Sequence, residues 1–241
     1  MLYVLGGLSL LFLVVAFIVT ESNAPYLLSG YNTLSEADKK KFYLAGYIPF
    51  FRKFHIFLGL SFFLIGLLVH TFISENAGGV FVGVYPILAY LYFIWSSQKF
   101  SGNVFAKQTK VGLVIGVAAL AFVIGIFGLA FKENQLLINP QSIELTGVYG
   151  ELIPISDIES IALVAQLPAI TIRKNGFAAS SVRKGYFGTR AGKKVKLLMH
   201  TKNPPFIQIT KKNGEQIFFA AKDKPSDEIF RELKTRSPQL P

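Results

Sequence analysis

The sequence predicts an α-helical membrane module followed by a separate β-rich domain that ends in a helix. Hydrophobic residues make up 51% of the 241 residues and charged residues only 16%, which exceeds the apolar content of an ordinary soluble domain. Long uncharged runs occupy residues 1–131, whereas short runs separated by Gly, Asn and Pro fill residues 132–241. The change of pattern places a domain boundary near Lys132.

Four apolar segments in residues 1–131 are long enough to cross a bilayer. A hydrocarbon core of about 30 Å requires about 20 helical residues at about 1.5 Å each. The first segment differs from a cleaved signal peptide because no basic residue precedes its apolar run, and the first charge is Glu21. The four predicted spans are Leu2–Thr20, Phe54–Ile73, Gly78–Ser96 and Val111–Phe131.

The charges of the loops predict how the four spans are oriented. Lys and Arg in short loops stay on the cytoplasmic side of the membrane. The second loop carries only Glu75, so the second loop, the N-terminus and the C-terminal domain are predicted to lie outside. If the third segment, which contains Pro86, were re-entrant, the C-terminal domain would change sides. The basic residues of the first loop are Lys39, Lys40, Lys41, Arg52 and Lys53, and those of the third loop are Lys99, Lys107 and Lys110.

The first loop contains a specific string of residues. Thr33 and Glu36 have capping-box spacing, which predicts a short helix that starts at Leu34 and meets no breaker until Gly46. The string LLSGYNTLSEADKKKF resembles the signature of a family of small uncharacterised bacterial membrane proteins, L-I-S-G-Y-N-T-M-S. This resemblance implies a multi-pass protein of the bacterial cytoplasmic (inner) membrane and no known activity. The core signature residues are Ser29, Gly30, Tyr31, Asn32 and Thr33.

Residues 132–241 have the pattern of a β-domain. About seven short runs rich in β-branched and aromatic residues predict strands. The segment KPSDEIFRELKTR predicts a final helix, with Pro225 and acidic residues at its start and an apolar stripe of Ile229, Phe230 and Leu233. One helix closing the open end of a bent sheet or partial barrel would bury this stripe.

The order of strands and helix is similar to the pleckstrin-homology (PH) superfold. The segments that carry this resemblance are YGELIPISDIESI, LPAITIRKNGF from Leu167 to Phe177, a predicted KGYFGT turn from Lys184 to Thr189, and NGEQIFFAAKD. A PH-like fold implies a noncatalytic adaptor, although a fold alone does not determine a function.

The β-domain has a basic cluster that is a candidate site for anions or lipid headgroups. Most of the cluster is predicted to lie in a Gly-rich connection between strands, and its alternative role is a solvated basic loop. A tethered outward domain without a stacking motif is a poor fit for nucleic acid. The candidate residues are Arg173, Lys174, Arg183, Lys184, Arg190, Lys193, Lys194 and Lys196.

The sequence gives little support for an enzyme. Cysteine is absent, the three histidines lack metal-ligand spacing, and no nucleophile elbow, Walker loop or dinucleotide fingerprint occurs. We therefore expect no catalytic residue, metal or cofactor. His70, near the outer end of the second span, is interpreted as an interfacial anchor rather than a proton relay.

Two functional hypotheses follow. In the first, the protein is a noncatalytic membrane adaptor or scaffold whose basic domain contacts lipid headgroups or a protein partner. A homo-oligomer could form through the Gly-rich fourth span, where Gly112 and Gly116 make a G-x-x-x-G pair. In the second, the helical module is a small transporter or an immunity-type protein, and the PH-like domain regulates it.

Overall fold

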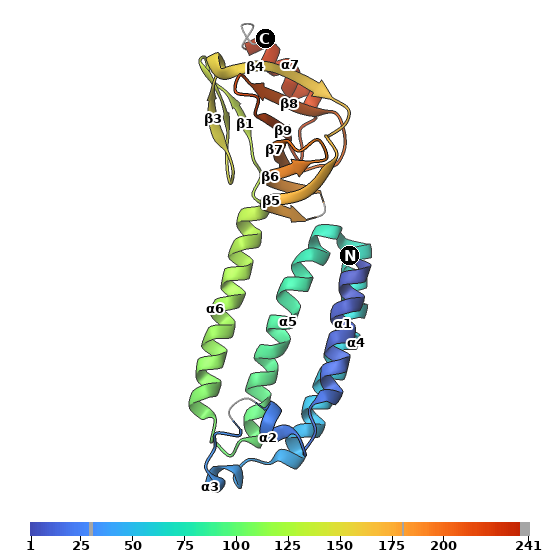
Figure 1. Cartoon of the computed structure of the whole chain (residues 1–241), viewed down its shortest axis with the longest axis vertical. Helices are drawn as coiled ribbons and strands as arrows, with labels where there is room; N and C mark the ends of the chain where they lie inside the picture. Colours follow the sequence, from blue (N-terminus) through green and yellow to red (C-terminus); the bar gives the residue numbers. More distant parts are fainter. Residues whose placement is uncertain (29–30, 180, 237–241) are drawn as a thin grey trace. The chain divides into compact units, whose positions relative to one another are not determined.

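The computed structural model describes residues 1–28, 31–179 and 181–236. The chain divides into two compact units, Met1–Gly125 and Ile126–Pro241. The first unit is helical, and the second consists of the end of α6, then mainly strands, and a helix near its C-terminal end (Figure 1).

The helical unit contains four long helices. Three candidate membrane spans are found among the described residues: Leu44–Ile73, Glu75–Phe100 and Ala106–Phe131. Helix α1 is equally apolar but has only 17 residues. The long helices are α1 (Leu2–Ile18), α4 (Leu44–Leu68), α5 (Glu75–Ser97) and α6 (Ala106–Phe131), and the short ones are α2 (Ala24–Leu27), α3 (Glu36–Lys39), the π-helix η1 (Val69–Ile73) and the 3₁₀-helix η2 (Gln98–Phe100).

Several helix boundaries differ from the sequence prediction, most clearly those of α4 and α3. Helix α4 begins ten residues before the predicted Phe54, because Arg52 and Lys53 end the apolar run but are good helix formers. Helix α3 begins at Glu36 rather than Leu34 and ends at Lys39. Its N-cap is Ser35, whose hydroxyl oxygen accepts the backbone N–H of Asp38 at 3.2 Å, so Thr33 is not the cap.

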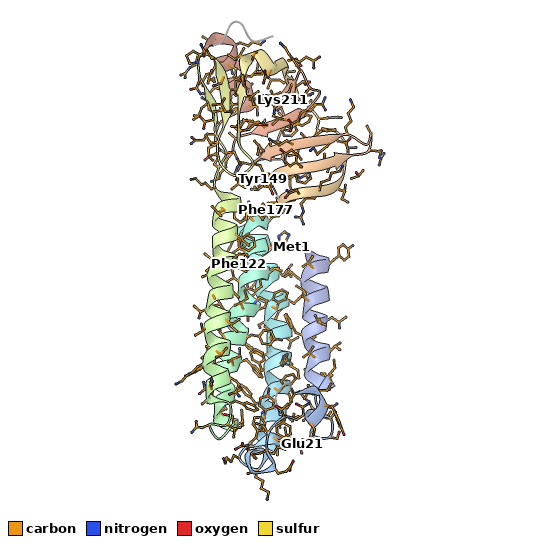
Figure 2. All side chains as sticks on the ribbon, turned by 60° about the vertical axis from the view of Figure 1, so that its left-hand side comes forward. Met1, Glu21, Phe122, Tyr149, Phe177 and Lys211 are labelled. Carbon is orange, nitrogen blue, oxygen red and sulfur yellow. The ribbon has the colours of Figure 1, made fainter. Side chains whose placement is uncertain are left out.

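Helices α1 and α4 pack against each other, and α1 lies between the labelled residues Met1 and Glu21 in Figure 2. The Ser9 hydroxyl donates to the Gly59 carbonyl at 2.6 Å, which satisfies a polar group inside an apolar contact. The Phe12 and Phe62 rings meet edge to face, with centroids 5.5 Å apart. Phe93 of α5 continues this aromatic core next to α4.

The first and third loops lie together at one end of the helical unit. The backbone N–H of Tyr43 donates to the Phe100 carbonyl at 2.8 Å, and the rings of Phe42 and Phe105 are 5.8 Å apart. The two lysine-rich loops therefore share one end of the bundle.

The second unit contains two sheets and a helix. The three-stranded sheet is antiparallel with the order β1-β2-β3, and the six-stranded sheet has the order β4-β8-β9-β7-β6-β5. Only β7 and β9 pair in parallel within the six-stranded sheet. The strands are β1 (Leu136–Ile138), β2 (Ser142–Leu145), β3 (Glu151–Pro154), β4 (Ile158–Val164), β5 (Ile170–Ala179), β6 (Val182–Thr189), β7 (Lys194–Met199), β8 (Phe206–Lys211) and β9 (Gln216–Ala220), with a 3₁₀-turn η3 (Ile155–Asp157) and helix α7 (Ser226–Arg236).

The six-stranded sheet carries apolar side chains on both faces. Residues from both sheets and from α7 form the larger core, to which α7 contributes Ile229 and Leu233 as the sequence predicts. Strands β4 and β5 are consecutive in the chain but lie at opposite edges of the sheet. The connection between them carries Leu167, which packs on a second core that includes Phe187, Met199 and Phe206.

The predicted number of about seven strands is wrong, because nine strands occur among the described residues. Strand β1 was not predicted, and the predicted turn from Lys184 to Thr189 lies within β6, which pairs with β7 on one side and with the edge strand β5 on the other. Glycine in this segment suggested a turn, but Gly185 instead allows two strands to approach each other closely. Gly176 and Gly185 pair across β5 and β6 with φ values of 154° and 110°, and a Cβ on either would collide with the opposite backbone.

Candidate functional site

The segment Lys132–Gln135, which leads from α6 into β1, is bonded to the β-domain at every residue. The Lys184 ammonium donates to the carbonyl of Lys132, just beyond the last helical residue, Phe131. The carboxylate of Glu133 accepts the backbone N–H of Lys222 at 2.6 Å, and the backbone N–H of Gln135 donates to the Thr146 hydroxyl at 2.9 Å. We call this segment the linker, and its hydrogen bonds hold the end of α6 to the β-domain.

Asn134 is the centre of the linker and is fully buried. Its side-chain amide donates to the carbonyls of Thr146 and Val148, and its backbone N–H donates to Nε2 of the buried His200 at 3.1 Å. An acceptor Nε2 requires an imidazole that carries no proton on that nitrogen. Burial and the neighbouring Lys184 charge lower the pKa of His200 to about 4, so the ring is neutral at physiological pH.

Lys184 is a structural cation. Its side chain is fully buried in β6, and its position opposite a helix C-terminus suits a positive charge. Burial lowers the pKa of the ammonium to about 8, although the Glu133 carboxylate opposes this shift. Lys184 therefore presents no charge at the surface of the domain.

An aromatic contact adjoins Lys184. Phe177 of β5 pairs with Lys184 across the strands, so the two side chains share one face of the sheet. The Phe177 ring meets those of Phe131 and Phe127 of α6 edge to face, with centroids 5.6 and 6.3 Å apart. Figure 2 shows Phe177 and Tyr149 where the chain enters the β-domain, with Lys211 farther along. The C-terminal part of β5 thus contacts the end of α6, which belongs to a candidate membrane span.

The eight predicted basic residues do not form one patch. Lys196, like Lys184, is buried, with 3% of its surface exposed. Arg173 and Lys174 are exposed on the edge strand β5, whereas Arg190, Lys193 and Lys194 are exposed at the turn between β6 and β7. Arg183 is half-buried on β6, and its neighbour Lys184 points to the opposite face because strand side chains alternate.

Lys196 is held by Glu151, a residue that the sequence analysis did not select. The Glu151 carboxylate accepts from Lys196 and Lys211, both at 2.6 Å, and Lys211 also pairs with Glu215 at 2.9 Å. Burial alone would raise the pKa of Glu151, but the hydrogen bonds from both lysines outweigh it and leave the pKa below its ordinary value. The alternation of side chains along β3 and β7 could have suggested an ion pair between these strands. Only the fold shows that Glu151 and Lys196 form it.

The signature loop lines a cavity of about 520 Å³ in the helical unit. Ser29 and Gly30 lie outside the described residues. The Tyr31 ring is 5.3 Å from that of Phe42, and both line the cavity, while Asn32 and Thr33 are exposed. Aromatic and polar side chains share the remaining lining, which includes Tyr47, Phe93, Gln98 and Gln108.

Comparison with known proteins identifies only the N-terminal part. Residues 6–101 match a family described as a domain of unknown function (DUF3784). The match covers less than half of the chain and extends from α1 to the residue that follows η2. This agrees with the predicted resemblance to an uncharacterised membrane family. No curated protein and no solved structure matches the chain.

Proposed function

We propose that the protein is a noncatalytic integral membrane adaptor whose β-domain contacts anionic lipid headgroups or a protein partner through the edge strand β5. The observation that carries this proposal is the contact of Phe177 with Phe131 at the end of α6. Arg173 and Lys174 are exposed on the same strand, three and four residues away, which is about 10–13 Å at about 3.3 Å per residue. A basic side chain near an anionic bilayer surface contributes about 1 kcal/mol of attraction, and this attraction falls off within a Debye length.

The proposal includes four membrane spans. Helix α1 would be about 26 Å long at about 1.5 Å per residue, close to the thickness of a hydrocarbon core of about 30 Å. Its antiparallel packing on α4, itself part of a candidate span, supports a transmembrane position. The lysine-rich loops at a shared end support a cytoplasmic location for both, and with four spans the proposed position of the β-domain is outside the bacterial inner membrane.

The proposal also includes a PH-like fold for the β-domain. Two packed sheets and a C-terminal helix that buries Ile229 and Leu233 support it. The nine strands and the parallel β7–β9 pair depart from the expected arrangement. The proposed adaptor role rests on the basic edge and not on the name of the fold.

Amide hydrogen exchange in nanodiscs tests the headgroup contact. The full chain is placed in phosphatidylcholine alone or in a mixture with phosphatidylglycerol, and exchange is followed in residues 170–179. We expect slower exchange in β5 with the anionic lipid, and less slowing at high salt because exposed charges are screened. The double variant Arg173→Ala/Lys174→Ala should lose the difference between lipids.

The matched control for this experiment is Lys212→Ala/Lys222→Ala, which removes two exposed lysines outside β5. This variant should respond to the anionic lipid as the original chain does. Identical exchange of β5 in both lipids would contradict the lipid contact and leave a protein partner as the ligand of the adaptor.

A further inference from the structure

The β-domain has a cavity of about 400 Å³ on the face of the six-stranded sheet that is opposite to Lys184. Met199 pairs with Arg183 across β7 and β6, so both side chains point to this face. The floor of the cavity is apolar and consists of Leu167, Met199 and Phe206 from the second core. The rim carries polar and basic residues, which are Gln166, Ser181, Arg183, Thr201 and Lys202.

The charged residues that line the cavity, Arg183 and Lys202, are both basic. No acidic residue lines it among the described residues. Arg183 is half-buried, and its guanidinium has no hydrogen-bond or ion-pair partner within residues 1–28, 31–179 and 181–236. The two buried lysines of the same sheet, Lys184 and Lys196, are both bonded to oxygen atoms. A half-buried guanidinium without a carboxylate is poised to bind an anion from outside the chain, and its planar fork matches a carboxylate.

The size and position of the cavity suit a chain-like ligand. Its volume lies within the range of about 300–1,000 Å³ that small-molecule sites occupy. Arg183 is adjacent to Lys184, which bonds to the residue that follows the end of α6. The cavity therefore lies on the opposite face of the sheet from this contact, one residue along β6 from the strand position that meets the end of α6.

We propose that this cavity binds a fatty carboxylate, with the carboxylate on the Arg183 guanidinium and the alkyl chain over Leu167, Met199 and Phe206. The apolar floor matches the alkyl chain of such a ligand, and the cationic rim matches its carboxylate. The proposal is separate from the headgroup contact of β5, because it uses neither Arg173 nor Lys174. The fatty-carboxylate site and the headgroup contact can therefore be tested independently.

The absence of cysteine from the chain allows a direct test. Gln166→Cys places a single thiol on the rim, and its rate of reaction with a maleimide is measured in the full chain in phosphatidylcholine nanodiscs. We expect decanoate to slow the reaction at least several-fold, whereas decanol, which partitions into the bilayer without a charge, has little effect. The exposed position Lys212, as a separate single cysteine, should react at the same rate with and without decanoate.

A second set of variants tests the role of the cation. In the Gln166→Cys background, Arg183→Gln should abolish protection by decanoate, and Arg190→Gln, in the exposed β6–β7 turn, should preserve it. Equal protection by decanoate and decanol, or full protection in the Arg183→Gln chain, would overturn the proposal. If Arg183→Gln disturbs folding, the comparison of decanoate with decanol on the original arginine still decides.

Discussion

At the scale of single residues, the Gly176–Gly185 pair explains why the segments KNGF and KGYF look alike and lie where they do. Both glycines have φ values between 110° and 154°, a region that residues with a Cβ rarely occupy. Each Cβ position is also filled by the backbone of the opposite strand. The pair lets β5 approach β6 next to Phe177 and Lys184, which hold the end of α6.

Gly185→Ala should therefore destabilise the β-domain by about 3 kcal/mol or more, from the strained φ and the collision with the Asn175 carbonyl together. Gly214→Ala is the matched control, since Gly214 has a φ of 83° but open space around its Cβ position. This control should cost only about 1–2 kcal/mol. Pulse proteolysis of the full chain in increasing urea measures the loss of stability in both variants. Equal losses of stability would show that the close approach of the strands is unimportant.

At the scale of secondary-structure elements, the linker differs from a flexible tether. Four consecutive residues after α6 each bond to a different part of the β-domain, and Asn134 is fully buried. A reorientation of the last turn of α6 would have to break these bonds or carry β6 with it. The linker is thus held to the β-domain by four successive residues, and one of its partners is the titratable side chain of His200.

His200 makes the stability of the linker depend on pH. Its pKa is about 4 in the folded chain and about 6.5 when unfolded, so the unfolded state binds more protons between these values. Stability is fully present above about pH 6.5 and decreases as the pH falls toward 4. Between pH 7 and 5, hydrogen exchange of residues 132–146, corrected for its intrinsic rate, should accelerate on the order of tenfold.

His200→Gln provides the control for this prediction, because the side-chain carbonyl of Gln can accept the Asn134 N–H without titrating. Exchange of the linker in this variant should depend much less on pH. The β8–β9 hairpin, residues 206–220, serves as an internal reference. If the variant keeps the full pH dependence, a group other than His200 is responsible.

The same elements show what the sequence could and could not predict. Hydrophobic runs located the long helices, runs of β-branched and aromatic residues located most strands, and terminal charges with an apolar stripe located α7, because these signals are local. Strand β6 was missed because glycine and lysine are typical of turns, and only its pairing with β5 and β7 explains them. Lys184 was selected as a surface ligand because its partner, a main-chain carbonyl 52 residues earlier, leaves no local pattern.

At the scale of the whole molecule, the side of the membrane on which the β-domain lies decides which ligands it can meet. The bundle brings the first and third loops to one end, so Lys39 to Lys41 and Lys99 add to one another as a cytoplasmic signal. Gly112 and Gly116 face Ile94 and Leu91 of α5, so this glycine pair serves packing within the chain. An oligomer through α6 would need another part of that helix.

Single cysteines labelled with a membrane-impermeant maleimide determine the topology of the full chain. Lys40→Cys lies in the first loop, Glu75→Cys in the second loop and Lys212→Cys in the β8–β9 turn, and all three positions are exposed. With four spans, intact cells should be labelled at positions 75 and 212, whereas position 40 should react only after lysis. Labelling at 75 but not at 212 would mean that α5 or α6 does not span. The β-domain would then face the cytoplasm, and its basic edge would meet the inner leaflet, where anionic lipid attracts each exposed lysine or arginine most strongly.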